Sequence, residues 1–459
     1  MKSGDGNPDF SRKRVLVVGL GVSGLLTARW LAGQNAKVTV SDMRSGSHID
    51  PGFLGEMRKL GVLLETGGHK EPTFLDAEVI IVSPGVPHDM ELLRSARSKD
   101  IPVMGETELA SRLIDTPIIA VTGTNGKSTV TALLGAMLEK AGMNAFVGGN
   151  IGTPLIAYAS GEKRADYVVL EVSSFQLDTI EKFSPLISII LNISPDHLDR
   201  YPSYEAYVRS KLGIFKNQGP GQYVILNDED ARLSRVKPGS GVSVIRYGVE
   251  RKEGRHAFVD GKEIVACPEK REKHFFSIES VGLEGRHNLE NLLSGVLVGL
   301  TLGLDTMCIQ ETLNEFRGLP DRLEKVAEVD GVTFYNDSKA TNVDAAVRAV
   351  EALDRPLILI AGGRHKGAQY GPLVRSAEKR VKRAVFLGEA RELLAGSFRG
   401  IVPFSMAEDI EEAVSVAFSW AKRGDAVLLA PACSSLDMFS DFSQRGRAFK
   451  RSAERCAHG

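Results

Sequence analysis

The segment AVTGTNGKSTV, residues 120–130, has the residue types that hold a phosphate group. Its glycines allow backbone N–H groups to turn toward an anion, and its lysine adds a positive charge. Its Ser-Thr pair places two hydroxyls at the start of an expected helix, where the helix dipole favours anions. The common phosphate loop has a glycine where this chain has Val121. The segment therefore predicts a variant phosphate site, and a glycine turn that only joins a strand to a helix is the alternative. The residues that carry this prediction are Gly123, Gly126, Lys127, Ser128 and Thr129.

A carboxylate inside an apolar strand is the second candidate for this chemistry. A phosphate loop usually acts with Mg²⁺, which binds oxygen ligands, and Ser128 offers one such oxygen. Glu171 lies within the apolar segment YVVLEVSS, residues 167–174, where a buried charge is costly unless a cation or hydrogen bonds satisfy it. Because ligands of parallel α/β sheets bind at the carboxyl ends of the strands, we expect Glu171 to bind the metal. A structural carboxylate satisfied by hydrogen bonds is the alternative.

Polar residues also follow the apolar segment LISIILNIS, residues 186–194. His197 stands in this loop with the charged residues Asp196, Asp199 and Arg200. A lone histidine after a strand is more often structural, but the charged neighbours keep a functional role open. Further on, Lys211 lies among apolar residues of an expected helix. Its surroundings alone favour a surface lysine whose aliphatic stem packs against the helix.

Two later segments place polar residues near expected helix starts. In GRHNLENLLSGVLVGL, residues 285–300, Asn288 and Asn291 either bind a nucleotide base or cap the helix, and spacing alone favours capping. In FYNDSKATNVDAAVRAV, residues 334–350, a polar loop joins a strand to a helix. A ligand site and a turn with a capping residue explain this loop equally well. Its polar residues are Asp337, Lys339 and Thr341.

The N-terminal segment RVLVVGLGVSGLLTARWLAGQNAKVTVSD, residues 14–42, predicts a strand, a glycine turn, a helix and a second strand. Gly19, Gly21 and Gly24 form the pattern G-x-G-x-x-G, and Asp42 ends the second strand. This is the dinucleotide-binding fingerprint in its expected context. Read without further information, it indicates an NAD site.

The alternation of apolar strands with amphipathic helices predicts an α/β protein with three domains. A chain of 459 residues is too long for one typical core. Continuous apolar runs are typical of parallel strands that are buried on both faces. Helical spacing follows the phosphate loop at Val130, Leu133, Leu134, Met137 and Leu138. The predicted domains are a Rossmann-like one at 1–105, a central phosphate-loop domain with a mostly parallel sheet at 106–318, and a Rossmann-like one at 319–459.

Composition narrows the class of protein. The formal net charge is −1, so no basic excess indicates a nucleic-acid partner. No apolar run reaches the roughly 18 residues that a membrane span needs, and the N-terminus has no signal-peptide core. The cysteines are widely spaced, which predicts reduced thiols and a cytoplasmic protein without membrane contact. They are Cys267, Cys308, Cys433 and Cys456.

Ten motifs, taken in order, resemble those of the Mur ligases. They are GLGVSG, SPGVP, VTGTNGKST, LEVSSFQL, SPDHLDRY, RSKLGIF, GRHNLEN, LPDRLE, NDSKATN and PACSSLDMFSDFSQRG. The resemblance runs from about residue 14 to about residue 455, and it is closest to the members that add D-glutamate. The phosphate loop of this family, T-G-T-N-G-K-[ST]-T, also lacks the first glycine, which accounts for Val121.

The resemblance implies an ATP-dependent ligase of peptidoglycan precursor synthesis. UDP-N-acetylmuramoyl-L-alanine and D-glutamate would be its substrates, and an acyl phosphate its intermediate. It implies ATP with two Mg²⁺ ions, or Mn²⁺ in their place, and a monomer. A sibling ligase that adds another amino acid is the alternative within the family. An NAD-binding oxidoreductase is the alternative outside it, and would leave the ATP motifs unexplained.

The resemblance also assigns roles around ATP. ATP contacts fall on Gly123, Thr124, Asn125, Gly126, Lys127, Ser128, Thr129, Asn288, Asn291, Arg322 and Asp337. Metal ligands fall on Ser128, Glu171, His197 and Lys211, and the catalytic residues on Lys127, Glu171, His197 and Lys211. Lys211 would be carbamylated, because a bare ammonium cannot bind Mg²⁺. This replaces the surface lysine that its surroundings favour.

For the two other substrates, the resemblance assigns one set of residues each. Contacts to the uridine diphosphate and muramoyl parts fall on Val22, Ser23, Asp42, Arg44, Gly85, Asn150 and Ser173. D-Glutamate contacts fall on Lys339, Thr341, Lys366, Ser435 and Phe442. This assignment gives the N-terminal glycine motif a uridine nucleotide in place of NAD. Met43 stands where relatives often have threonine, so a side-chain hydrogen bond is lost there. The loop GGRHKGAQY also differs from the GGDGK form of some relatives.

Overall fold

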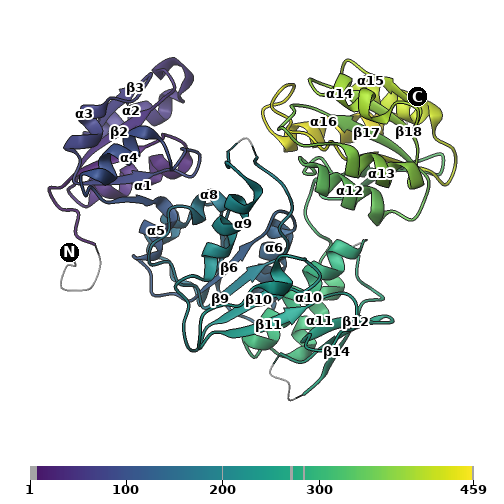
Figure 1. Cartoon of the computed structure of the whole chain (residues 1–459), viewed down its shortest axis with the longest axis horizontal. Helices are drawn as coiled ribbons and strands as arrows, with labels where there is room; N and C mark the ends of the chain where they lie inside the picture. The colour runs from purple at the N-terminus through teal and green to yellow at the C-terminus, as the bar shows by residue number, and fades with distance from the viewer. Residues whose placement is uncertain (1–7, 199, 269–271, 283–284, 457–459) are drawn as a thin grey trace.

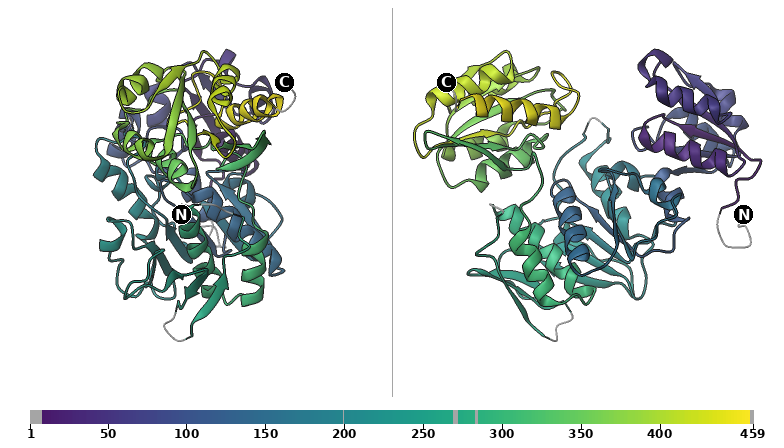
Figure 2. Two further views of the ribbon diagram at one scale, coloured as in Figure 1. Left: turned by 90° about the vertical axis from the view of Figure 1, so that its right-hand side faces the viewer. Right: turned by 180° about the vertical axis from the view of Figure 1, so that it is seen from behind.

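The computed structural model describes residues 8–198, 200–268, 272–282 and 285–456. These residues form three α/β units that follow one another along the chain, each with its own sheet (Figure 1). The fold class is therefore as predicted. Figure 1 and the right-hand view of Figure 2 show the N-terminal and C-terminal units on opposite sides of the upper end of the central unit.

The N-terminal unit has five parallel strands in the order β3-β2-β1-β4-β5. The strands are β1 (Arg14–Val18), β2 (Lys37–Asp42), β3 (Leu63–Thr66), β4 (Val79–Val82) and β5 (Val103–Gly105). The helices are α1 (Val22–Gly33), α2 (Pro51–Lys59), α3 (Glu71–Asp76), α4 (Glu91–Ser98) and α5 (Glu106–Ser111), with a 3-10 turn at Gly46–His48. A Cβ on Gly24 would lie 1.9 Å from the carbonyl oxygen of Gly19. The glycine motif thus lets α1 approach β1 closely, with its N-terminus at the carboxyl ends of the strands.

The central unit has nine strands in the order β14-β13-β12-β11-β10-β9-β6-β8-β7. The strands from β11 to β7 in this order are all parallel to their neighbours. At the other edge, β12 pairs with β13 and β13 with β14 in antiparallel fashion. The strands are β6 (Ile118–Thr122), β7 (Ala145–Gly149), β8 (Tyr167–Glu171), β9 (Ile187–Ile190), β10 (Tyr223–Asn227), β11 (Ser243–Tyr247), β12 (Ala257–Asp260), β13 (Glu263–Ala266) and β14 (His274–Ser277). The helices are α6 (Lys127–Lys140), α7 (Leu155–Ala159), α8 (Ser174–Leu177), α9 (Tyr204–Leu212), α10 (Arg286–Thr301) and α11 (Thr306–Glu315), with 3-10 turns at Gly213–Phe215 and Leu233–Arg235. The five apolar residues predicted to face the core from α6 are all buried.

The C-terminal unit has six strands in the order β15-β16-β20-β17-β18-β19, and only β15 is antiparallel to its neighbour. The strands are β15 (Glu324–Val329), β16 (Val332–Asn336), β17 (Leu357–Gly362), β18 (Val381–Leu387), β19 (Phe404–Met406) and β20 (Ala426–Leu429). The helices are α12 (Val343–Ala352), α13 (Gly371–Arg380), α14 (Arg391–Phe398), α15 (Ile410–Trp420) and α16 (Phe442–Arg455). The loops that follow β16, β17 and β20 therefore meet at one edge of this sheet.

The connections between the sheets are short. β5 ends at Gly105, and α5 follows at once and packs against α7 of the central unit. The second connection runs from the end of α11 at Glu315 to the start of β15 at Glu324. The boundaries predicted at 105/106 and 318/319 lie within these connections. No described helix combines the length and the apolar character that a bilayer crossing requires.

Candidate active site

The phosphate loop is closed around the side chain of Lys127, at the start of α6. Its Nζ donates to the carbonyl oxygens of Gly123 (3.0 Å) and Thr124 (2.9 Å), and burial lowers the pKa of this lysine. Gly126 has a φ of 87°, and a Cβ there would lie 2.4 Å from Asn291 Oδ1. Only glycine fits at this position, because both the backbone angle and the space exclude a side chain. The loop is thus shaped to present its N–H groups to an anion.

Glu171 ends β8 and has the features expected of a metal ligand. Its side chain is buried, and Oε1 accepts from Asn150 Nδ2 at 2.8 Å. Oε2 is buried without a hydrogen-bond partner among the described residues. An unpaired buried carboxylate oxygen is costly, so a cation beside it would stabilise the site. The alternative of a structural carboxylate satisfied by hydrogen bonds explains only one of its two oxygens.

Of the other predicted metal residues, Ser128 and Lys211 lie at the phosphate loop, but they do not form a ready metal-binding cluster with Glu171. Ser128 Oγ accepts from Arg322 Nη2 at 2.7 Å, which joins the central unit to the C-terminal unit. Within the described ranges, no three His, Cys, Asp or Glu side chains are grouped to hold an ion. A metal here would therefore need hydroxyl, phosphate or modified-lysine oxygens beside Glu171. The buried unpaired oxygen and this hydroxyl are donors of the type that Mg²⁺ takes.

Lys211 is buried, so the surface position that its surroundings favour is wrong. Its side chain is 2% exposed, its Nζ donates to the Gly123 carbonyl at 2.8 Å, and it lies 4.7 Å from the ring centre of Tyr207. Burial and the nearby charge of Lys127 lower its pKa well below the ordinary value. A buried lysine with a depressed pKa is nucleophilic, which suits its modification by CO₂.

His197 stands in the loop after β9 with a left-handed backbone, φ 54°. Burial lowers the pKa of its imidazole, although the charge of Asp196 opposes this effect. Asp196 accepts from His197 N (2.9 Å), Asn342 Nδ2 (2.9 Å) and Lys366 Nζ (3.1 Å), and so links the central unit to the C-terminal unit. The third acidic residue of this segment, Asp199, lies outside the described residues.

A cavity of about 60 Å³ between the central and C-terminal units gathers the predicted nucleotide residues. Its lining includes Asn125, Gly126, Thr129, Asn288, Asn291, Arg322 and Asp337. Capping does not explain these polar side chains. The N-cap of α10 is Gly285, which has no side-chain hydrogen bond, and the N-cap of α12 is Asn342. Burial raises the pKa of Asp337 to about 7.

Two residues of this cavity were missed by the sequence analysis. Arg348 Nε donates to Asp344 Oδ2 at 2.9 Å, and the same oxygen accepts from Asn125 Nδ2 at 2.7 Å. His287 lies beside them, and burial lowers its pKa to about 4. His287 belongs to the quoted motif GRHNLEN, but its role depends on packing against the C-terminal unit, which the motif alone does not show.

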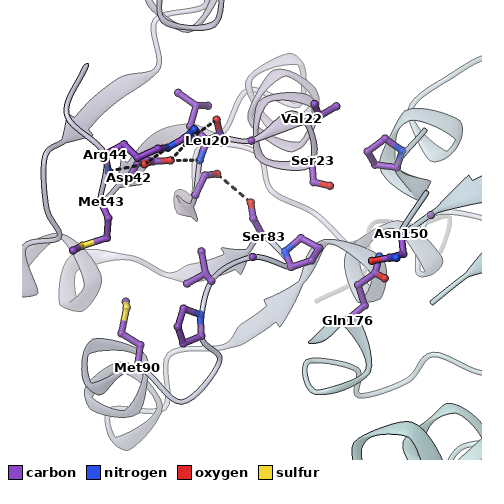
Figure 3. A pocket seen from close by; sticks show the side chains of 18 of the residues that line it. Leu20, Val22, Ser23, Asp42, Met43, Arg44, Ser83, Met90, Asn150 and Gln176 are labelled. Atoms are coloured by element: carbon purple, nitrogen blue, oxygen red, sulfur yellow. Dashed lines mark hydrogen bonds and ion pairs between the residues drawn. The ribbon is translucent and has the colours of Figure 1, made fainter. Parts of the chain in front are cut away.

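A larger cavity of about 790 Å³ lies at the carboxyl ends of the N-terminal strands (Figure 3). Six of the seven residues predicted for the UDP-linked substrate line it, namely Val22, Ser23, Asp42, Arg44, Gly85 and Asn150. Ser173 does not, because its hydroxyl caps α8 and contacts Gln176. Asn150 comes from the central unit and also binds Glu171, so this cavity borders the candidate metal residue.

Arg44 and Asp42 form a fork at one end of this cavity. Arg44 Nε donates to Asp42 Oδ1 at 2.9 Å, and Nη2 donates to Oδ2 at 2.8 Å and to the Leu20 carbonyl at 2.9 Å. Burial opposes ionisation of Asp42, but hydrogen bonds from Arg44 and from Leu20 N–H lower its pKa to about 2. The carboxylate therefore holds the cavity wall in place.

The predicted D-glutamate residues lie on three loops of the C-terminal unit and at the start of α16, and they do not share one cavity. Lys366 lines a cavity of about 20 Å³ with Asp196 and His197. Lys339 lines the nucleotide cavity instead, 3.7 Å from the ring centre of Phe442, and burial lowers its pKa to about 8. Ser435, which is buried, and Thr341 line neither cavity.

Arg445, which the sequence analysis missed, holds these three loops together. Its side chain is 2% exposed and donates to Ser338 O (2.9 Å) and Cys433 O (3.3 Å) on two of the loops, and to Gly362 O (3.4 Å) at the end of β17, where the third loop begins. Ser338 Oγ in turn donates to the Phe442 carbonyl at 2.8 Å. The signal was present in the sequence, because this arginine stands on the same face of α16 as Ala448, Phe449 and Ala453, which are buried.

Family models match nearly the whole chain in three consecutive parts. They are the N-terminal domain of MurD-like Mur ligases at residues 13–105, the Mur ligase middle domain at 121–299 and the glutamate ligase domain of Mur ligases at 321–433. The N-terminal glycine motif thus falls in a Mur ligase domain, which leaves the NAD interpretation without support.

Curated relatives extend over the same length. A protein from Desulfosudis oleivorans, named UDP-N-acetylmuramoylalanine--D-glutamate ligase, is 43% identical over 453 residues, which cover 98% of this chain and 98% of its own. A protein of the same name from Pelotomaculum thermopropionicum is 42% identical over 444 residues, with 96% and 97% covered.

Solved structures agree in fold. The pseudomurein peptide ligase type C from Methanothermus fervidus has a TM-score of 0.61 at 19% identity, with 96% of this chain and 99% of its own covered. The UDP-N-acetylmuramate-alanine ligase MurC from Thermotoga maritima has a TM-score of 0.59 at 19% identity, with the same shares covered. The matching domains, the length of the similarity and the geometry of the phosphate loop agree, and the chain belongs to the Mur ligase family.

Proposed function

We propose that this chain joins D-glutamate to UDP-N-acetylmuramoyl-L-alanine while ATP is cleaved to ADP and phosphate. The observation that carries the proposal is the place of Asn150, which lines the large cavity and donates to Glu171 beside the phosphate loop. A donor held in the large cavity would thus have its far end at the site of phosphate chemistry. Relatives that carry the name of this activity cover almost the whole chain.

The reaction solves a simple chemical difficulty. A carboxylate does not accept an amine at neutral pH, because it is anionic and has no good leaving group. An oxygen of the alanyl carboxylate bonds to the γ-phosphorus of ATP, and the bond from that phosphorus to the bridging oxygen of ADP breaks. The amine of D-glutamate loses a proton and bonds to the carbonyl carbon of the acyl phosphate, and phosphate leaves. The product is an amide, for use in peptidoglycan synthesis and hence in cell-wall growth and division.

The phosphate loop would serve the first step by electrostatics and positioning. Lys127 and the N-terminus of α6 face the same space, and both favour the negative charge of the γ-phosphate. The remaining loop residues, Gly123, Thr124, Asn125, Gly126, Ser128 and Thr129, would cradle the phosphates. Asn288, Asn291, Arg322 and Asp337 would hold the rest of the nucleotide from both sides of the 60 Å³ cavity.

Members of the family act with ATP and Mg²⁺, and the residues present fit such an ion. Ser128 and Glu171 would hold one ion through a hydroxyl and a buried, unpaired carboxylate oxygen. His197 and a carbamylated Lys211 would hold a second, with Mn²⁺ as a substitute in either place. Bound Mg²⁺ neutralises phosphate charge and so makes the approach of an anionic donor less costly.

The acceptor would bind at the loop edge of the C-terminal unit. Lys366 and Ser435 offer a cation and a hydroxyl, which suit a carboxylate. Lys339, Thr341 and Phe442 would complete this site. Lys366 is already paired with Asp196, so a D-glutamate carboxylate that binds Lys366 would displace this ion pair. We also propose that the protein works as a monomer in the cytoplasm, as the family does.

The test is phosphate release from ATP with UDP-N-acetylmuramoyl-L-alanine present. D-Glutamate, L-glutamate, L-alanine and meso-diaminopimelate are compared as acceptors. Release with D-glutamate alone supports the proposal, whereas release with another amino acid assigns a sibling activity. Lys127→Ala is the control, because it removes the loop charge and should abolish release with every acceptor.

A further inference from the structure

Arg200 joins the N-terminal unit to the central unit beside the large cavity. Its Nη1 donates to the carbonyl oxygen of Gly85 at 3.2 Å, and Gly85 lines that cavity. Gly85 belongs to the loop SPGVP, residues 83–87, which follows β4, whereas Arg200 belongs to the loop that follows β9. The proposed reaction so far gives this arginine no role.

The guanidinium of Arg200 also lies over an aromatic ring of the central unit. Its Cζ is 4.5 Å from the ring centre of Phe175. At this distance the positive charge is attracted to the electron-rich face of the ring. Phe175 is half-buried and packs against the hydrophobic core. Arg200 therefore holds a backbone carbonyl of one unit close to an aromatic side chain of the other.

Phe175 is fixed by the short helix that carries it and by a neighbouring ring. It belongs to α8, which follows Glu171 closely and is capped by the hydroxyl of Ser173. Tyr201 stacks on the Phe175 ring, with 5.9 Å between the ring centres and 11° between the ring planes. The hydroxyl of Tyr201 donates to Asp178, just beyond α8, at 2.7 Å. The Phe175 ring is thus a well-supported partner for the guanidinium.

A small pocket shows that Phe175 meets the same N-terminal loop that Arg200 binds. Phe175 and Gln176 line this pocket from the central unit, and Ser83, Pro84 and Val86 line it from the N-terminal unit. Gln176 also lines the large cavity, at the end next to the central unit (Figure 3). The contacts of Arg200 therefore lie where the large cavity passes from one unit to the other.

His197 contacts the same aromatic ring. Its imidazole meets the Phe175 ring edge-on, with 4.9 Å between the ring centres. The backbone N–H of Arg200 donates to the His197 carbonyl at 2.9 Å, so a tight turn brings both side chains to Phe175. The bond from Arg200 to Gly85 thus connects the wall of the large cavity to the loop that carries a proposed metal ligand.

A ligand that spans both units depends on how firmly the units are held together. Asp42 and Arg44 line the large cavity from the N-terminal unit, whereas Asn150 lines it from the central unit and donates to Glu171. If the units are free to shift, ordering them on binding costs conformational entropy. This cost weakens a ligand that contacts both units, but it does not affect a ligand that contacts only the first.

We propose that Arg200 is a positioning residue, which sets the distance between the two halves of the donor cavity by binding Gly85 and Phe175 at once. This inference rests on the proposed function, which supplies a donor that is long enough to span both units. The effect of Arg200 should appear in the affinity for UDP-N-acetylmuramoyl-L-alanine and not in the affinity for UDP, which needs only the N-terminal unit. An arginine that only stabilises its own loop would not separate the two affinities.

The test measures the affinity of the full-length protein for UDP and for UDP-N-acetylmuramoyl-L-alanine by calorimetric titration without ATP. Arg200→Met keeps an apolar stem that can pack on the ring, but it cannot donate to Gly85. Arg200→Lys keeps a charged donor but loses the planar group that lies over the ring. Arg232→Met is the matched control, because Arg232 also lies over a ring, 5.1 Å from the centre of Tyr204, and its guanidinium bonds to Glu205 of its own unit. Thermal unfolding of each variant shows whether the fold is kept.

We expect the wild type to bind the donor more tightly than UDP, because only the donor reaches the central unit. In Arg200→Met this preference should fall about tenfold or more, while the affinity for UDP stays unchanged. Arg200→Lys should keep part of the preference, and Arg232→Met should keep all of it. An unchanged preference in a folded Arg200→Met overturns the inference, and so does an equal loss of affinity for both ligands. A wild type that binds the donor no more tightly than UDP contradicts the proposed function itself and, with it, the inference.

Discussion

At the scale of the residue, Lys211 shows how the fold changes the chemistry of a side chain. Its local sequence favours an exposed lysine, yet it is 2% exposed and donates to the Gly123 carbonyl of the phosphate loop. A buried ammonium without a paired carboxylate is costly, so a structural role alone does not explain it. Carbamylation would turn this cation into an anionic oxygen ligand beside the site of phosphate chemistry.

Lys211→Ala should lower ligase turnover by about a hundredfold or more, because the proposed carbamate ligand of the second metal ion, which would offset phosphate charge, is lost. Short carboxylic acids such as acetate should restore part of the activity, since they supply oxygen ligands in the vacated space. Arg209→Ala is the control, as this exposed residue lies on the same helix. Steady-state phosphate release measures both variants, and full activity of Lys211→Ala would rule out the carbamate.

At the scale of the element, the last helix organises, through Arg445, the loops that we propose to bind the acceptor. Its guanidinium donates to carbonyl oxygens on the loops after β16 and β20 and to that of the last residue of β17. Burial lowers the pKa of Arg445 to about 10, and the buried charge is satisfied by these backbone oxygens. The side chain itself touches none of the predicted D-glutamate side chains, so it acts as a positioning residue.

Arg445→Lys keeps the charge but cannot reach three loops with one ammonium. We expect the KM for D-glutamate to rise about tenfold or more, with the KM for ATP little changed. Arg447→Lys, an exposed position on the same helix, serves as the control. Initial rates at varied D-glutamate and varied ATP separate the two effects. Equal increases in both KM values would mean that Arg445 only supports the fold.

How much the sequence predicts depends on whether a residue's partners are local. The positions of the phosphate loop and of Glu171 at strand ends follow from the sequence, because the strand, the turn and the helix adjoin along the chain; their roles stay a prediction. The contacts of Arg200 and Arg445 were missed, because their partners lie far away in sequence. Arg200 binds Gly85, 115 residues distant, and Arg445 depends on Ser338, 107 residues distant. The D-glutamate contacts stay a prediction for the same reason, since three separate loops must meet to form them.

Glu106 opens α5, the helix that joins the first two units, and it gives stability a pH dependence. Burial raises its pKa from 4.5 to about 7, although a hydrogen bond from Ile156 N at 2.7 Å opposes the effect. The folded state therefore favours the protonated form. The resulting stabilisation is complete below pH 4.5 and is lost as the pH rises through about 7. The difference corresponds to on the order of 3 kcal/mol.

Glu106→Gln should remove this dependence, because glutamine keeps the acceptor oxygen and cannot ionise. Its unfolding temperature should exceed that of the wild type at pH 8 and match it near pH 4.5. Exposed Glu91→Gln should follow the wild type at both pH values. Thermal unfolding monitored by circular dichroism checks this, and parallel curves for wild type and Glu106→Gln would contradict it.

At the scale of the whole molecule, the central and C-terminal units meet through a few polar contacts. Asn125 donates to Asp344 at 2.7 Å, and Lys366 donates to Asp196 at 3.1 Å. Hydrogen bonds to charged groups contribute only about 1.5–3 kcal/mol each. The nucleotide cavity lies between the same two units, so a bound nucleotide would add contacts to both. Closure of the C-terminal unit should therefore depend on ATP.

Small-angle scattering can follow this closure. The radius of gyration should fall when a non-hydrolysable ATP analogue and Mg²⁺ are added to the free protein. Asp344→Ala, which removes one contact between the units, should need more of the analogue to reach the same value. An unchanged radius in the wild type at saturating analogue would show that closure does not follow nucleotide binding.

The central claim is that a donor carboxylate in the large cavity is activated by the γ-phosphate of ATP and then transferred to D-glutamate. The most direct measurement uses UDP-N-acetylmuramoyl-L-alanine with ¹⁸O in the alanyl carboxylate, together with ATP and D-glutamate. Mass spectrometry of the released phosphate should find one ¹⁸O atom for each amide formed, because the oxygen bonded to phosphorus leaves with it. Phosphate without ¹⁸O would contradict the acyl phosphate and with it this account of the site.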